Sequence, residues 1–172
     1  NKILSIIVPV YNEVKTVLIV LEKLKNLKLY HNYKSQIIVV DDNSNDGTVG
    51  LLQKIKGNED FKNITLIFKK KNMGKGDSQK IAIPLCEGDF TIIQDADLEY
   101  NVENINSLLK LIIEKNFDAV LGYRKLKNTK VYSTYFIFHK LAVMSLTIMT
   151  NLLYKSKFKD VCTCYRLVKT SL

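Results

Sequence analysis

The stretch from Gln36 to Thr48, QIIVVDDNSNDGT, contains the features that decide the fold class. Its first residues, QIIVV, form a short apolar run of the kind found in fully buried strands. The following DDNSNDGT is a dense turn signal, and Asp46 is placed to cap a helix over about residues 47–57. The stretch therefore predicts a buried strand that leads through a turn into a helix, which is the repeating unit of α/β sheets.

The same alternation continues on both sides of this unit. The apolar runs predict strands over 3–9, 36–40, 64–68, 89–94 and 118–122. Helical spacing of apolar residues predicts helices over 14–27, over 47–57, after a basic glycine-containing loop up to about Cys86, and around Ile105–Ile112. Because the strands are continuous apolar runs, we expect an α/β fold with a mostly parallel sheet sandwiched by helices. The length of 172 residues favours one domain.

The alternation stops near Tyr132, and residues 131–154 are strongly apolar and aromatic. His139, Lys140 and Asn151 interrupt this segment, so it lacks the ~20 uninterrupted apolar residues that a membrane-spanning helix needs. We predict an amphipathic helix here. It could lie on a bilayer surface or pack on the protein core, and one helix with two faces could do both.

Charge and cysteine content narrow the classes of partner. Lys and Arg number 26 against 17 Asp and Glu, for a net charge of +9. This excess suits a phosphate-rich ligand, nucleic acid or an anionic membrane surface, although a general lysine bias would also produce it. No signature of a nucleic-acid-binding fold accompanies the charge, so we expect no nucleic-acid partner.

Three cysteines without a disulfide framework fit a reducing compartment. Since the chain starts at Asn1 rather than Met and stops at Leu172 without an evident end, we expect a fragment of a longer protein.

Polar clusters follow the predicted strands where those strands end. They are Tyr11-Asn12-Glu13, Asp41-Asp42, Asp95-Ala96-Asp97 and Arg124. In open parallel sheets, ligands bind beyond the carboxyl ends of the strands. The clusters therefore predict one binding site at this edge of the sheet.

Asp95 and Asp97 stand two residues apart, directly after the strand predicted over 89–94. Two carboxylates at a strand end can converge on one hard cation, and Mg²⁺ or Mn²⁺ keeps free positions for substrate phosphates. Such an ion stabilises the negative charge of a departing nucleotide diphosphate. The D-x-D pattern alone is also common in solvated turns. Its position after a buried strand favours the metal site.

The other clusters suit a nucleotide. Asp41 or Asp42 could accept hydrogen bonds from a ribose or a uracil imide, or could simply cap the turn. Tyr11 could pack on a base. Lys75 lies between two glycines that let the backbone approach a ligand, and Arg124 is well placed for a phosphate. Neither a Walker loop nor a G-x-G-x-x-G motif is present in the sequence.

Together these motifs resemble a known family. The segments SIIVPVYNE, IIVVDDNSNDGT, NMGKGDSQKIAI, IIQDADLEY and VLGYR occur in the order and spacing of family 2 glycosyltransferases with the GT-A fold. The group that uses polyprenyl phosphates, with dolichol-phosphate mannose synthases and dolichyl-phosphate glucosyltransferases, is the most similar. DVCTCYRLVKTSL also resembles a segment of bacterial members. The resemblance covers nearly all of the chain.

The resemblance implies a role for each site residue. The nucleoside pocket would be lined by Pro9, Tyr11, Glu13, Val40 and Asp42. The sugar nucleotide would be held by Lys75, Gln94, Asp95, Ala96, Arg124 and Arg166, with Mg²⁺ or Mn²⁺ on Asp95 and Asp97. The catalytic residues would be Asp95, Asp97, Arg124 and Asp160. Because a phosphate acceptor is already ionised, Asp160 would position it near the site rather than deprotonate it.

The resemblance further implies an inverting, metal-dependent transfer of a hexose to a polyprenyl phosphate, either dolichyl or undecaprenyl. The donor would be of the GDP-mannose or UDP-glucose type. Residues 1–125 would form the nucleotide-sugar-binding part and residues 126–172 the acceptor- and membrane-facing part, at the cytoplasmic face of the membrane. Whether the protein forms a homo-oligomer is left open.

Two alternative functions stand beside transfer to a polyprenyl phosphate. The first is transfer to a cell-wall or capsular polysaccharide, and the second is a catalytically silent nucleotide-sugar-binding module. The silent module stays open because Cys162 replaces a Glu that many relatives have.

Overall fold

The computed structural model describes residues 2–123, 134–155 and 157–172. The chain forms two compact units, one of residues 1–120 and 166–172 and the other of residues 121–165. The strands are β1 (Ile3–Val10), β2 (Lys34–Asp41), β3 (Ile64–Phe68), β4 (Phe90–Ile93), β5 (Ala119–Leu121) and β6 (Arg166–Lys169), and all of them belong to the first unit except the last residue of β5. The helices of the first unit are α1 (Val17–Asn26), α2 (Thr48–Ile55), α3 (Lys75–Ala82) and α4 (Asn104–Lys115), with short 3₁₀ turns at Tyr30–Asn32, Glu59–Phe61 and Ile83–Leu85.

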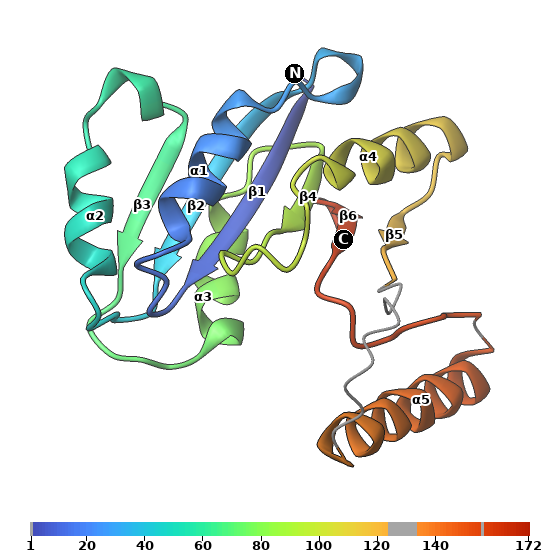
Figure 1. The fold of residues 1–172 in the computed structure, drawn as a ribbon. Helices are drawn as coiled ribbons and strands as arrows, with labels where there is room; N and C mark the ends of the chain where they lie inside the picture. Colours follow the sequence, from blue (N-terminus) through green and yellow to red (C-terminus); the bar gives the residue numbers. More distant parts are fainter. Residues whose placement is uncertain (1, 124–133, 156) are drawn as a thin grey trace. The chain divides into compact units, whose positions relative to one another are not determined.

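The strands form one sheet in the order β3-β2-β1-β4-β6-β5 (Figure 1). β1 is parallel to β2 and to β4, and β2 is parallel to β3. β6 runs antiparallel to β4. The sheet is thus mostly parallel, which confirms the predicted α/β class and explains the continuous apolar strands, since helices cover both faces.

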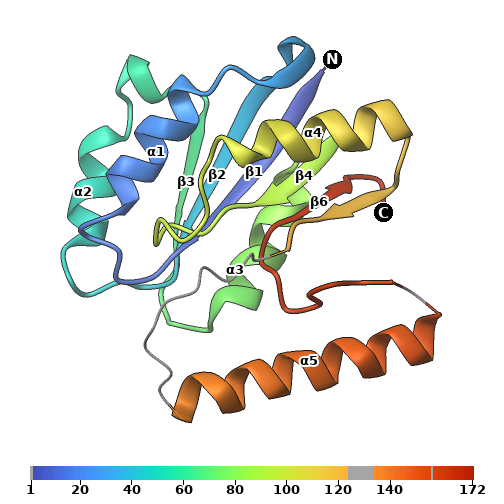
Figure 2. The same ribbon diagram turned by 45° about the vertical axis from the view of Figure 1, so that its right-hand side comes forward.

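The two faces of the central strands are buried by different helices. Ile7, Ile38 and Val40 pack with Ala82 of α3 on one face. The alternate residues of β1 and β2 point to the other face, where α1, α2 and α4 lie (Figures 1 and 2). The side chains on both faces are fully buried, so the sheet and its carboxyl ends have a rigid base.

Three details differ from the sequence prediction. β6 was not predicted, because its sequence RLVK has a charged residue at each end and only two apolar residues, and this strand is set by its antiparallel pairing with β4. The first helix begins at Val17 rather than at residue 14, since the residues before it form a turn closed on the Glu13 carbonyl and Thr16 has a φ of −119°, far from the usual helical value. Asp46 accepts the Thr48 N–H at 3.0 Å, as predicted for a cap, from one position before the helix boundary at Gly47.

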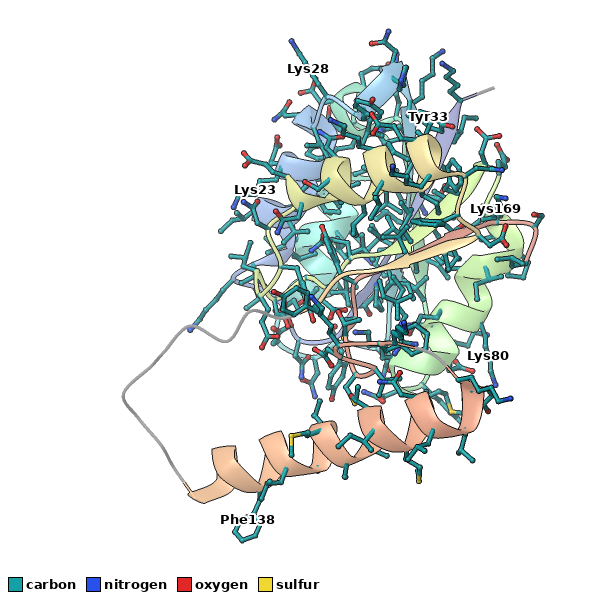
Figure 3. The ribbon with its side chains drawn as sticks, turned by 90° about the vertical axis from the view of Figure 1, so that its right-hand side faces the viewer. Lys23, Lys28, Tyr33, Lys80, Phe138 and Lys169 are labelled. Carbon is teal, nitrogen blue, oxygen red and sulfur yellow. The ribbon has the colours of Figure 1, made fainter. Side chains whose placement is uncertain are left out.

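The second unit contains helix α5 (Thr134–Tyr154), which the sequence predicted over 131–154. Thr147 accepts the N–H of Val161, and the side chain of Asn151 makes two hydrogen bonds with the backbone of Phe158. Other positions of the helix expose large apolar side chains, and the side chain of Phe138 projects outward (Figure 3) with 72% of its surface exposed. Within the described residues, no helix combines the length and apolar character needed to cross a bilayer.

The close packing of Gly88 against the backbone of β1 leads to a testable prediction about the fold. Its N–H donates to the Ser5 hydroxyl, and an added Cβ would lie 2.6 Å from the Ser5 nitrogen and 2.8 Å from the Ile3 oxygen. Gly88→Ala should therefore lower the free energy of unfolding by about 1–3 kcal/mol in urea titrations, because backbone atoms must shift to make room. The control is Gly50→Ala in α2, where a Cβ meets nothing within 4 Å. That variant should be stabilised by ~0.5–1 kcal/mol, and equal effects of the two variants would contradict the packing described for Gly88.

Candidate functional site

The carboxyl ends of β1, β2 and β4 lie beside the N-terminus of α3 (Figure 1). Residues of these segments line a pocket. All of its lining residues belong to the first unit, and its volume is about 200 Å³. The lining consists of Pro9, Val10, Tyr11, Glu13, Asp42, Lys75, Ser78, Asp95, Ala96 and Asp97. The clusters that follow three separate strands in the sequence therefore meet in one cavity.

The end of β4 places two carboxylates in this pocket. Gln94 is fully buried, and its amide donates to the Asp95 carbonyl at 3.0 Å and to the Tyr100 carbonyl at 3.5 Å. This amide therefore bridges the two ends of the acidic loop. Asp97 Oδ1 accepts the Glu99 N–H at 3.0 Å. The carboxylates of Asp95 and Asp97 are thus held by a short, hydrogen-bonded loop.

Lys75, the first residue of α3, contacts one of these carboxylates. Its Nζ lies 2.5 Å from Asp95 Oδ1, with 42% of the Lys75 side chain exposed and 13% of the Asp95 side chain. Gly74, directly before it, has a φ of 86°, a left-handed value that glycine adopts without strain. The glycine lets the chain turn so that the helix starts at the pocket with its lysine facing Asp95.

A second ion-pair network lies beside the pocket. Asp42 Oδ1 accepts from Lys69 Nζ at 2.5 Å and from the Met73 N–H at 3.0 Å, and Oδ2 accepts the Gly74 N–H at 2.7 Å. Lys69 also lies 2.6 Å from Asp77 Oδ2, and only 7% of the Lys69 side chain is exposed. Asp42 and Lys69 therefore fasten the loop before α3 onto the end of β2.

This network fixes the charge of its members. Burial alone would raise the pKa of Asp42, but the hydrogen bonds from Lys69, Met73 and Gly74 together lower it. Burial likewise works to lower the pKa of Lys69, and the hydrogen bonds to Asp42 and Asp77 outweigh it and raise the pKa. Both groups are therefore charged at neutral pH, and each charge is compensated locally.

Hydrogen bonds also tie the end of β1 to the turn after β2. The Glu13 N–H donates to Thr48 Oγ1 at 2.9 Å, and the Thr48 hydroxyl donates to Asp46 at 2.6 Å. The Asn12 N–H donates to Ser44 Oγ at 2.9 Å. These bonds position the loop that carries Glu13 and the half-exposed Tyr11 on the rim of the pocket.

The structure brings together most of the predicted site residues. Those that line the pocket are Pro9, Tyr11, Glu13, Asp42, Lys75, Asp95, Ala96 and Asp97. Val40 and Gln94 do not line it, because both are fully buried. Arg166 is exposed as the first residue of β6. Asp160 belongs to the second unit, where it accepts the Cys162 N–H at 3.0 Å, and Arg124 lies outside the described residues.

Three contributing residues were missed by the sequence analysis. Val10 and Ser78 line the pocket, and Lys69 neutralises Asp42 beside it. Ser78 is fully buried in the first turns of α3, which the glycine-rich segment could have indicated. Lys69 is the first of three consecutive lysines, and such a run ordinarily predicts a solvated loop. Its burial depends on two acids that are distant in the sequence.

The donor set of the pocket fits a hard divalent cation. Asp95 and Asp97 supply carboxylate oxygens from one loop, and Mg²⁺ and Mn²⁺ are commonly held by one or two carboxylates together with substrate phosphates. Across residues 2–123, 134–155 and 157–172, no group of three or more His, Cys, Asp or Glu side chains is arranged to hold a metal by itself. The two carboxylates would therefore complete a metal site only with oxygens from a ligand or water.

The sequence of this chain is similar to those of known proteins. A protein of Methanocaldococcus jannaschii, itself uncharacterized, is 31% identical over 170 residues, which are 95% of this chain and 70% of that protein. The undecaprenyl-phosphate 4-deoxy-4-formamido-L-arabinose transferase of Pseudomonas syringae is 31% identical over 119 residues, or 69% of this chain. The match spans only 35% of that transferase.

A solved structure and a family model agree with these relatives. The mannosyltransferase of Pyrobaculum calidifontis, solved in complex with GDP-Man and Mn²⁺, superposes with a TM-score of 0.57 and 25% identity. The superposition covers 71% of this chain and 35% of the mannosyltransferase. The model for Glycosyl transferase family 2 matches residues 5–172. The chain therefore belongs to glycosyl transferase family 2, a family of glycosyltransferases, and has the GT-A fold.

Proposed function

We propose that the chain is the catalytic part of a divalent-metal-dependent, inverting glycosyltransferase. It would move a hexose from a nucleotide-diphosphate sugar to a polyprenyl phosphate. The observation that carries this proposal is the pocket, where carboxylates from three strand ends meet Lys75 at the N-terminus of α3. Family membership supplies the reaction class, and the charge of the pocket supports the kind of donor.

The charge of the pocket supports a metal-bound diphosphate. Four carboxylates line it, from Glu13, Asp42, Asp95 and Asp97, against the ammonium of Lys75. Even with Lys69 beside Asp42, the pocket is locally acidic, although the whole chain has a net charge of +9. A diphosphate would be repelled there unless a divalent cation joined it to Asp95 and Asp97. The Pyrobaculum mannosyltransferase, solved with GDP-Man and Mn²⁺, is an example of such a combination.

In the proposed reaction, an acceptor phosphate oxygen attacks the anomeric carbon from the face opposite the nucleotide. A new carbon–oxygen bond forms, the bond to the donor diphosphate breaks, and the diphosphate leaves with the bonding electron pair. When bound, the cation would stabilise the charge on this leaving group. Asp95 and Asp97 would orient the diphosphate, and Lys75 would contribute a positive charge close to it.

No general base is required, because a phosphate monoester is already largely ionised at neutral pH. We therefore propose a positioning role for Asp160, together with Arg124 and Arg166, toward the phosphate groups of the acceptor or donor. Tyr11 and Asp42 would face the nucleoside. Asp42 already accepts three hydrogen bonds, so its contribution there would be to hold the 69–74 loop in place as well as to contact the ligand.

The polyprenyl acceptor is supported by two observations. The Pseudomonas syringae relative is named as an undecaprenyl-phosphate transferase. In addition, α5 exposes large apolar side chains and has no acidic residue in its sequence, and lysines follow it at positions 155, 157 and 159. Such a helix would bind the interface of an anionic membrane, which would place the enzyme at the cytoplasmic leaflet beside its lipid acceptor.

A ligand-stabilisation experiment tests the donor site. The melting temperature would be measured with UDP-glucose, UDP-GlcNAc and GDP-mannose, each with and without Mn²⁺. At a ligand concentration of about 100 times Kd, binding to the native state adds ~2.7 kcal/mol of stability, which raises the melting temperature by several degrees. We expect one nucleotide class to give this shift only with Mn²⁺. If no nucleotide sugar stabilises the protein, the proposed donor site is wrong.

A further inference from the structure

We propose that Lys75 acts as an internal counter-ion that holds the metal-binding carboxylate Asp95 until a nucleotide diphosphate arrives. The metal and the nucleotide would then bind cooperatively rather than independently. This inference rests on the proposed function, because it concerns the same pocket. It goes further by assigning one side chain as the element that couples the two ligands.

The geometry places Lys75 where a metal would bind. Its ammonium lies 2.5 Å from Asp95 Oδ1, although the two residues belong to different elements, the start of α3 and the loop after β4. A divalent ion bonded to the same carboxylate would lie within a few ångströms of this ammonium. The two cations would repel each other, so Lys75 and the metal compete for Asp95.

A diphosphate removes this competition. Lys75 is the one cationic side chain among the described residues that line the pocket, so an anionic ligand there could form an ion pair with this ammonium. Once the ammonium turns to the phosphate oxygens, Asp95 becomes free for the metal. Each ligand therefore lowers the cost of binding the other, and this coupling is necessarily reciprocal.

The side chain of Lys75 is much more exposed than the side chain of the neighbouring Lys69. The Lys75 side chain is 42% exposed, and it is flanked by Gly74 and Gly76, whose added Cβ atoms would meet nothing within 4 Å. A ligand in the pocket can therefore reach the Lys75 side chain. Lys69 is only 7% exposed and is held by both Asp42 and Asp77. Lys69 therefore holds the loop in place, whereas Lys75 acts as an exchangeable counter-ion.

Mn²⁺ binding measured by electron paramagnetic resonance, which counts the free ion, tests this inference without nucleotide. Lys75→Met should bind Mn²⁺ about tenfold more tightly than the wild type, since a repelling charge next to the ion is gone. Lys75→Arg should bind like the wild type. The matched control is Lys80→Met, which removes the same charge from an exposed position of α3 outside the pocket (Figure 3). It should change the affinity little.

A second arm measures the coupling with UDP and GDP. In the wild type, the nucleotide that binds should raise Mn²⁺ affinity at least about tenfold, which is within the usual range of such couplings. The factor should be several times smaller in Lys75→Met. If Lys75→Met binds Mn²⁺ no more tightly than Lys80→Met, the counter-ion role is wrong. If neither nucleotide binds the wild type, the proposed function fails, while the metal comparison still decides the role of Lys75.

Discussion

Asp97→Ala should reduce sugar transfer by about a hundredfold or more, because a bound divalent cation contributes several kcal/mol of transition-state stabilisation that this carboxylate would help to supply. The melting temperature should hardly change. Asp97 is exposed, and it accepts a hydrogen bond from the Glu99 N–H within an exposed loop. The measurement is nucleotide release from the donor, followed in parallel with thermal unfolding.

Two further variants separate charge from loop geometry. Asp97→Asn keeps an oxygen that can accept the Glu99 N–H but removes the charge, so it should be nearly as inactive as the alanine variant. Glu99→Ala removes an exposed acid two positions away that does not line the pocket, and it keeps the backbone N–H. It should retain activity. Equal nucleotide release by the wild type and Asp97→Ala would show that Asp97 has no catalytic role and would favour a binding module that is catalytically silent.

Lys69→Met should lower the free energy of unfolding by about 3 kcal/mol, because it leaves the buried carboxylate of Asp42 without its cation. Asp42 keeps two backbone hydrogen bonds, so the protein should still fold. The control is Lys70→Met at the next, exposed position, where a change within about 0.5 kcal/mol is expected. Urea unfolding at neutral pH measures both variants. A similar stability of the two variants would contradict the bracing role of Lys69.

The same variant predicts a pH dependence. Because the folded-state pKa of Asp42 is below its ordinary value of 3.8, its ion pair stabilises the wild type above that pH. This contribution is lost as the pH falls through the lowered pKa. The stability difference between the wild type and Lys69→Met should therefore be largest near pH 7 and should shrink as the pH falls below 3.8 toward the lowered folded-state pKa of Asp42. A difference that stays constant from pH 7 to pH 3 would show that the charge of Asp42 is not involved.

Much of the fold could be predicted from the sequence because the strands carry their own signals. The strands β1, β2 and β4 contain consecutive residues that are buried on both faces of the sheet, whereas the edge strand β3 is mostly half-buried. The strand β6 could not be predicted in this way. It has four residues, and its position between β4 and β5 depends on pairing with a segment more than seventy residues earlier.

The candidate site, like the fold, could be predicted from the sequence only in part. The carboxylates of Asp95 and Asp97 follow a strong strand, so their place at the edge of the sheet follows from the sequence. The sequence did not show which lysine pairs with which carboxylate. Lys75 contacts Asp95 and Lys69 contacts Asp42 across different elements, and only the folded chain brings these pairs together. The consequences for metal and nucleotide binding come from those pairs.

The most direct test of the central claim is transfer of radiolabelled hexose to undecaprenyl phosphate in detergent micelles with Mn²⁺. The donor is the one identified by thermal stabilisation, and a soluble oligosaccharide serves as the competing acceptor. We predict a chloroform-soluble labelled lipid of inverted anomeric configuration, formed only with the metal and lost in Asp97→Ala. Label that appears in the oligosaccharide and not in the lipid would contradict the proposed acceptor, and label released only as free sugar would contradict the transfer itself.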